Sequence, residues 1–284
     1  MKTKTLVPFL ALTFGFTWGI AALLIFFTDQ VTAIFGEITS NNPLFILAVY
    51  SPGFTSLFLV WRTYGLKGLG SFLRRLTLVR MPLAWWLFLV LGIPALKYIG
   101  AALNGTAGEF PYSPWVLVLP ALAQAFFLGT IEEFGWRGIA LPLLQRKMAP
   151  VWAGLVVGII WAVWHLPAFL LGGGLVYDSW AVVPFFIGTI ALSMVITPLF
   201  NSARGSILIA YLAHFQLMNP IIPEAQPWEN YIFAIATVVI VILHRRTMFK
   251  KGTGVTEVLM PEHESETNYE ADEAAQKSLS ATAG

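Results

Sequence analysis

Long apolar stretches return along the chain, separated by short polar stretches. Eight of them can be delimited: residues 6–27, 43–61, 82–102, 115–131, 151–171, 180–200, 206–222 and 228–243. Their lengths are near or above the ~18 residues that indicate a helix able to cross the hydrocarbon of a bilayer. The pattern therefore predicts an all-α polytopic membrane protein with about eight transmembrane helices.

The distribution of Lys and Arg predicts the orientation of these helices. Basic residues precede the first stretch and follow the second, fourth, sixth and eighth, whereas the loops after the other four stretches have none. Of the 17 Lys and Arg residues, only Lys97 lies inside an apolar stretch. Because loops rich in Lys and Arg stay in the cytoplasm, we predict that both termini are cytoplasmic.

The composition supports a membrane protein and excludes several kinds of chemistry. The chain is 57% apolar and 11% charged, against roughly 25% charged residues in soluble domains. It has no cysteine, which excludes disulfides, cysteine-based metal sites and thiol nucleophiles. No basic cluster is dense enough to indicate nucleic acid. We expect residues 1–243 to form a membrane-embedded domain and the polar residues 244–284 to form a disordered cytoplasmic tail.

Charged residues inside the apolar stretches are candidates for function, because burying a charge in a membrane is costly. The densest cluster is Glu132, Glu133 and Arg137, which we place at the cytoplasmic end of the fourth stretch. On a helix, Glu133 and Arg137 lie about 40° apart and can form an ion pair, whereas Glu132 points about 100° away from Glu133. Glu132 is thus freer to face a cavity and act as a general base. The alternative is a charge cluster that anchors the helix at the interface.

Two histidines lie in other apolar stretches, His165 in the fifth and His214 in the seventh. Pro167 cannot donate a hydrogen bond to the carbonyl of Val163, so the helix should open or kink there. His214 and the nearby Asn219 offer donors for an oxyanion, although interhelical hydrogen bonding is the simpler explanation. The chain has no HExxH, GxGD or Gly-x-Ser-x-Gly motif, which leaves glutamate and histidine as the candidate catalytic pair.

Taken together, these residues resemble the CPBP family, which groups type II CAAX prenyl endopeptidases with bacteriocin-processing and self-immunity proteins. The resemblance covers roughly residues 62–220 and rests on three motifs: Glu132-Glu133-x-x-x-Arg137, Trp161-x-x-x-His165, and His214 with Asn219. Trp161 replaces the usual Phe. Asn219 follows His214 by five residues, where the family commonly has four, so a helix distortion before Pro220 is needed to align it. Otherwise Gln216 is the substitute.

The resemblance implies an endopeptidase within the membrane, open to the cytoplasm. Glu132 with His165 would activate a water, His214 with Asn219 would stabilise the oxyanion, and Glu133 with Arg137 would support the site. We expect no required cofactor, although Glu132, His165 and His214 form the ligand set of a known type of zinc site. The expected partners are the lipid bilayer and a membrane-associated protein or peptide substrate, and the expected location is a bacterial plasma membrane.

Two other classes of function stay open at this point. A transporter or proton relay would also place Glu and His inside spans, and Lys97 favours it. A non-catalytic immunity or assembly factor is the third. The protease interpretation has one geometric difficulty: His165 lies about 21 Å along its helix at 1.5 Å per residue, whereas Glu132 is expected near the cytoplasmic end of another.

Overall fold

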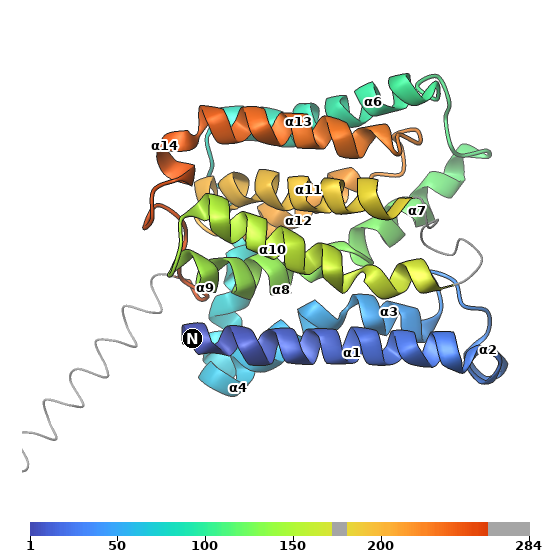
Figure 1. Ribbon diagram of the computed structural model, residues 1–284, viewed down its shortest axis with the longest axis horizontal. Helices are drawn as coiled ribbons and strands as arrows, with labels where there is room; N and C mark the ends of the chain where they lie inside the picture. Colours follow the sequence, from blue (N-terminus) through green and yellow to red (C-terminus); the bar gives the residue numbers. More distant parts are fainter. Residues whose placement is uncertain (172–180, 261–284) are drawn as a thin grey trace, which may run out of the picture.

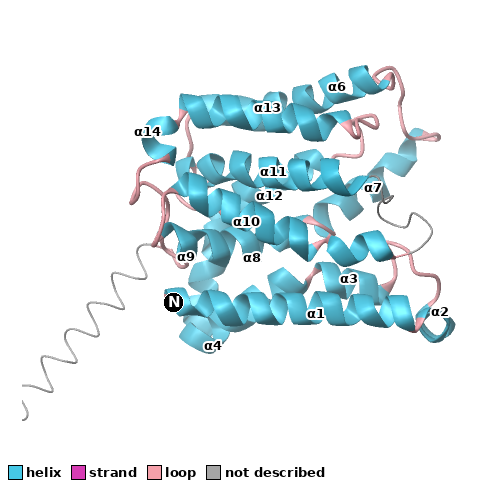
Figure 2. Cartoon of the chain, viewed as in Figure 1, coloured by secondary structure: helices cyan, strands magenta, loops and turns pink. Residues whose placement is uncertain are grey.

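The computed structural model describes residues 1–171 and 181–260, and all regular secondary structure in them is helical (Figure 2). The α-helices are α1 (Leu6–Phe26), α2 (Thr28–Phe35), α3 (Pro43–Val49), α4 (Ser51–Leu73), α5 (Leu83–Leu87), α6 (Ile93–Asn104), α7 (Val118–Phe127), α8 (Glu133–Gly135), α9 (Leu141–Gln145), α10 (Pro150–Trp164), α11 (Val182–Ser202), α12 (Ile207–Leu217), α13 (Trp228–Leu243) and α14 (Arg245–Met248). Short 3-10 turns are η1 (Thr3–Thr5), η2 (Arg74–Thr77), η4 (Trp115–Leu117), η5 (Thr130–Glu132) and η7 (Leu166–Leu170), and η3 (Phe88–Gly92) and η6 (Trp136–Ala140) are π-helical.

The polytopic all-α architecture predicted from the sequence is confirmed. Among the described residues, five helical runs are long and apolar enough to span a membrane: Thr3–Phe26, Leu83–Asn104, Trp115–Gln145, Pro150–Leu170 and Val182–Ser202. A sixth is the pair Pro43–Val49 and Ser51–Thr77, bent by 57°. The last two predicted segments correspond to the shorter apolar helices α12 and α13. Trp180, where the sixth predicted segment begins, lies outside the described residues.

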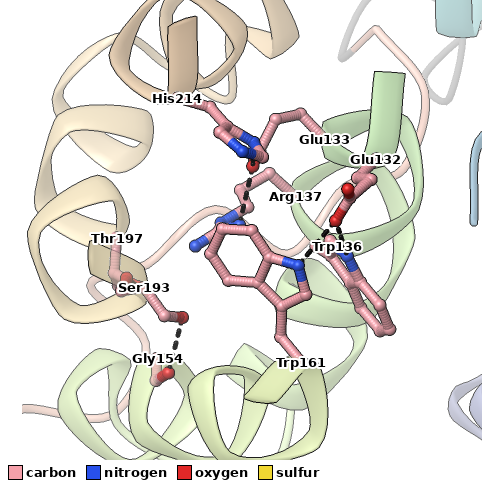
Figure 3. Close-up of polar contacts among 9 residues, drawn as sticks. All are labelled: Glu132, Glu133, Trp136, Arg137, Gly154, Trp161, Ser193, Thr197 and His214. Atoms are coloured by element: carbon pink, nitrogen blue, oxygen red, sulfur yellow. Dashed lines mark hydrogen bonds and ion pairs between the residues drawn. The ribbon is translucent and has the colours of Figure 1, made fainter. Parts of the chain in front are cut away.

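Helix α11 is the centre of the bundle. It packs against α10 on one side and α13 on the other, while α1, α3 and α4 lie beyond α10 (Figure 1). Small residues allow the close approach to α10, because a side chain at Gly158 would come within 2.9 Å of the Ile190 Cα. Ser193 Oγ also donates to the Gly154 carbonyl at 2.8 Å (Figure 3). Small residues and hydroxyl hydrogen bonds are typical contacts between membrane helices.

The fourth segment is longer than the sequence predicts. It does not end near residue 131 with a charged cluster at its cytoplasmic end, because the helical run continues to Gln145 and contains η5, α8, η6 and α9. Glu132, Glu133 and Arg137 are all buried inside this run. The pairing of opposite charges within a largely apolar stretch explains how the helix continues past them. Arg137 therefore lies within the bundle and not in a cytoplasmic loop.

The body of the protein also extends further toward the C-terminus than predicted. Beyond α14 the chain turns back, and Val258 and Leu259 are buried in the main core. Arg146 Nε donates to the Thr256 carbonyl at 2.8 Å, and Arg75 Nη1 donates to the Val258 carbonyl at 2.8 Å. The expectation of a disordered tail from residue 244 is thus wrong for residues 244–260. The rest of that predicted tail, residues 261–284, lies outside the described residues.

Candidate active site

Glu132 and Glu133 are neighbours in sequence but face different partners. Glu132 ends η5, and its Oε2 accepts hydrogen bonds from two indoles, Trp161 Nε1 at 2.6 Å and Trp136 Nε1 at 3.3 Å (Figure 3). The side chain is held between the fourth helical run and α10. Glu132 also lines a cavity inside the bundle, which is described below. The sequence predicts that its side chain points away from Glu133 and can face such a cavity.

Glu133 binds a cation and a histidine through one oxygen. Its Oε1 accepts from Arg137 Nη1 at 2.9 Å, so the predicted ion pair is confirmed, and His214 Nδ1 lies 3.0 Å from the same atom. Both members of the ion pair are fully buried, and the guanidinium of Arg137 sits 4.7 Å from the centre of the Trp161 ring. Such a cation–π contact further stabilises a desolvated guanidinium.

The bond between Glu133 and His214 links α8 to α12, and sequence reasoning missed it. No spacing could have revealed it, because the two residues are 81 positions apart. The bond fixes the imidazole of His214 through Nδ1, which leaves Nε2 for other partners. His214 lines the cavity together with Glu132.

His165 caps the C-terminal end of α10. The helix ends at Trp164 and continues as the 3-10 turn η7, so the break predicted near Pro167 is confirmed. The Nδ1 of His165 lies 2.9 Å from the Trp161 carbonyl. A carbonyl only accepts hydrogen bonds, so Nδ1 carries the proton and Nε2 keeps its lone pair in the neutral ring.

Glu132, His165 and His214 line one cavity of about 390 Å³. The three side chains come from the fourth helical run, the end of α10 and the end of α12. The geometric difficulty seen in the sequence disappears, because Glu132 lies within its helical run and not at the end. The wall is mostly apolar, and further polar residues contribute to it: Thr17, Ser40, Thr189, Gln226, Glu229 and Asn230.

The structure does not bring Asn219 to His214. Helix α12 ends at Leu217, and Asn219 lies in the following turn, where it donates to Gln216 Oε1 at 2.9 Å and accepts from the Ile221 amide at 3.2 Å. Gln216, the substitute, donates to the Leu89 carbonyl at 3.3 Å. Neither residue lines the cavity. The helix distortion that would align Asn219 with His214 across their five-residue spacing is therefore absent from the described residues 207–220.

The same side chains do not form a metal site as they are arranged. Within the described part of the chain, no three His, Asp or Glu residues are placed so that they could hold one ion together. Glu132 Oε2 is occupied by two indoles and His214 Nδ1 by Glu133. As they are arranged, Glu132, His165 and His214 are not grouped as the ligands of a single ion among the described residues.

Lys97 has a buried acidic partner on another helix. Its Nζ lies 3.6 Å from Glu229 Oε2, and it also donates to the Leu217 carbonyl. Helix α13 begins at Trp228, the first residue of the eighth predicted stretch, and carries Glu229 in its first turn. The pair joins α6 to α13, which gives Lys97 a structural partner.

Comparisons with known proteins agree with the motifs. The family model described as type II CAAX prenyl endopeptidase Rce1-like matches residues 114–219, a range that contains all three motifs. A curated protein, CAAX prenyl protease 2 from Methanococcus maripaludis, is 25% identical over 185 residues. That alignment covers 60% of this chain and 65% of the relative, so the chain spans slightly less than two thirds of the relative's length.

Proposed function

We propose that this protein is an intramembrane endopeptidase that cleaves a membrane-associated protein or peptide. The match to the family model and the similarity to CAAX prenyl protease 2 support this proposal. One observation carries the proposal. Glu132, His165 and His214, from three separate helical runs, line the same cavity. A carboxylate and two imidazoles around one cavity can supply a general base and hydrogen-bond donors for hydrolysis of a peptide bond.

In this mechanism Glu132 takes a proton from water as the water oxygen attacks the carbonyl carbon of the substrate. His165 assists by accepting a hydrogen bond from that water through Nε2. The indoles of Trp161 and Trp136 hold the carboxylate of Glu132 in one orientation. Such preorganisation accelerates the reaction because the base need not reorient in the transition state.

His214 stabilises the oxyanion that forms on the carbonyl oxygen. With both ring nitrogens protonated, it keeps its bond to Glu133 through Nδ1 and donates Nε2–H to the oxyanion. The tetrahedral intermediate then collapses: the C–N bond breaks, and Glu132 returns its proton to the departing amine. The products are a carboxylic acid, which keeps the second proton of the water, and an amine, so protons and electrons balance without a further reactant.

The test of the general base is Glu132→Gln, which preserves size and the ability to accept indole hydrogen bonds. Purified protein in liposomes is incubated with a panel of membrane-associated peptides, and cleavage is followed by mass spectrometry. Loss of a general base costs ~10²–10⁴-fold in rate, whereas the melting temperature should stay near that of the unmodified protein. Wild-type turnover by Glu132→Gln would contradict the proposal. A folded but inactive Glu133→Gln beside an active Glu132→Gln would reverse the two roles.

We also propose that no metal is required, because Glu132, His165 and His214 are not grouped, among the described residues, so that they could hold one ion together. Protein treated with a strong chelator and then freed of it should retain full activity. Metal content is measured in parallel. About one equivalent of zinc in active protein, with activity lost to the chelator and restored by zinc, would show that the site uses a metal.

A further inference from the structure

Asn230 holds an unused hydrogen-bond donor in the wall of the cavity. The residue belongs to the first turn of α13 and lines the cavity, and its Nδ2 is buried without a hydrogen-bond partner among the described residues. A buried amide donor in this state costs free energy, which a ligand that accepts its hydrogen bond would recover. The mechanism proposed above gives Asn230 no role.

Two neighbouring helices, α6 and α11, hold the start of α13 in place (Figure 1). Gly100 of α6 allows close contact, since a side chain there would come within 2.9 Å of the Glu229 backbone nitrogen, and Lys97 Nζ lies 3.6 Å from Glu229 Oε2. Gly188 of α11 leaves room for the Asn230 amide, because a side chain there would lie 1.8 Å from Asn230 Oδ1. The amide thus sits against α11 on a backbone whose position is already fixed, as a binding group requires.

Helix α11 also relates Asn230 to the candidate catalytic groups. Phe185 of α11 packs against His165, with the ring centres 5.0 Å apart. Gly188 follows Phe185 by three residues on the same face of the helix, a rise of about 4.5 Å, and both residues line the cavity. A residue of an extended peptide spans about 3.3 Å. A group bound to Asn230 is therefore expected within about three residues of a peptide bond held at His165.

We infer that Asn230 is a substrate-binding residue, which donates a hydrogen bond from Nδ2 to a main-chain carbonyl of a peptide bound in the cavity. A turn of the amide about the Cβ–Cγ bond directs the donor to the ligand. The inference rests on the proposed function and names its substrate class: a segment that is not helical beside its cleavage site. In an intact α-helix the carbonyls are already bonded within the helix, so only an extended segment has a carbonyl free to accept.

The experiment measures peptide binding without turnover. The probes are the membrane-associated peptides of the panel described above, each carrying a photoreactive diazirine and a fluorophore, and the protein is Glu132→Gln in liposomes. The concentration that gives half-maximal cross-linking to the protein is measured. Asn230→Ala is added to this protein. Asn104→Ala is the matched control, because the Asn104 amide already donates to the Glu224 carbonyl at 3.3 Å and Asn104 does not line the cavity.

A second measurement changes the acceptor in place of the donor. The peptide that binds most tightly is made with each of its main-chain amides replaced in turn by a thioamide, whose sulfur is a weaker hydrogen-bond acceptor than oxygen. Each of these peptides is tested on Glu132→Gln and on Glu132→Gln with Asn230→Ala. A carbonyl that accepts from Asn230 loses affinity in the first protein and not in the second.

We expect Asn230→Ala to raise the half-maximal concentration about 3–10-fold, the effect of losing one hydrogen bond, and Asn104→Ala to leave it unchanged. The melting temperature of Asn230→Ala should not fall, because its Nδ2 has no partner to lose among the described residues. One thioamide should weaken binding only in the protein that keeps Asn230.

The inference is overturned if Asn230→Ala binds as tightly as its parent, if its melting temperature falls together with its affinity, or if every thioamide acts equally on both proteins. It is also overturned if no peptide of the panel cross-links saturably. A peptide that binds as expected but is not cleaved by the unmodified protein would refute the proposed endopeptidase and leave the peptide-binding role of Asn230 standing, so the two failures are distinguishable.

Discussion

Glu133 joins Arg137 and His214 through a single carboxylate oxygen atom. That atom accepts from Arg137 at 2.9 Å and lies 3.0 Å from His214 Nδ1, and the side chain has no exposed surface. A buried pair adds little net stability when intact, but removing one partner leaves an uncompensated charge. Sequence reasoning assigns Glu133 to structural support, and the structure adds the orientation of His214 to that assignment.

We predict that Glu133→Gln lowers both stability and activity. Arg137 would keep its charge in a buried site without its carboxylate, which should reduce the free energy of unfolding by about 3–5 kcal/mol. Activity should fall as well, because His214 loses a charged acceptor. Thermal unfolding in detergent and peptide cleavage are the measurements.

The double variant Glu133→Gln with Arg137→Met is the control for this charge effect. Methionine fills a similar space without a charge, so part of the lost stability should return. Activity should not return with it, since His214 remains without its carboxylate partner. If the double variant is less stable than Glu133→Gln, the loss comes from packing and not from the unpaired charge.

At the scale of the helices, the irregular fourth run positions the site. Between Trp115 and Gln145 the chain changes from α-helix to 3-10 helix at Glu132 and to π-helix at Trp136–Ala140. Departures of this kind often occur at functional sites because they change the direction of side chains within a helix. Gly135 brings this run against α4, where a side chain would come within 2.8 Å of the Pro52 carbonyl oxygen.

We predict that Gly135→Ala destabilises the protein by about 1–3 kcal/mol, the usual cost of overpacking a filled core. It should also reduce activity, because the shift moves the neighbouring glutamates. Gly15→Ala is the matched control, since nothing lies within 4 Å of a side chain at that exposed position of α1. Both variants are compared by thermal unfolding. Equal melting temperatures would show that α4 and the fourth run are not in close contact.

At the scale of the whole molecule, the C-terminal segment 249–260 packs across the end of the bundle where the N-terminus and α14 lie (Figure 1). Gln145 Nε2 donates to the Val255 carbonyl at 2.8 Å, and Met260 N donates to Ser71 Oγ at 3.1 Å. With Val258 and Leu259 buried, the segment joins α4, α9 and η2. It contributes to stability far from the cavity.

A chain that ends at Gly252 should therefore unfold at a lower temperature than the full chain. It loses three buried apolar side chains, Val258, Leu259 and Met260, each worth roughly 1.5–3 kcal/mol. It also loses one acceptor each of Arg75, Gln145 and Arg146. A chain that ends at Met260 keeps these contacts and is the matched control. The two are compared by thermal unfolding in the same detergent. Identical melting temperatures would contradict a structural role for residues 253–260.

The sequence by itself determined the features that depend on local spacing. Apolar length predicted the all-α membrane architecture, the i, i+4 spacing predicted the pair of Glu133 and Arg137, and Pro167 predicted the end of α10. These predictions succeeded because a helix fixes the relative directions of residues within a few turns. The motifs predicted Glu132, His165 and His214 as site candidates for the same reason, since each motif is local.

Only the tertiary structure decided which segments meet. It placed His214 on Glu133, Trp161 on both Glu132 and Arg137, and Glu229 on Lys97. It also turned Asn219 toward Gln216 and away from the cavity, and it packed residues 255–260 on the core. The physical reason is that burial depends on what covers a residue. The charged cluster of Glu132, Glu133 and Arg137, considered alone, indicates the end of a helix. Neighbouring helices supply partners for these charges, so the cluster can lie in the middle of a helical run.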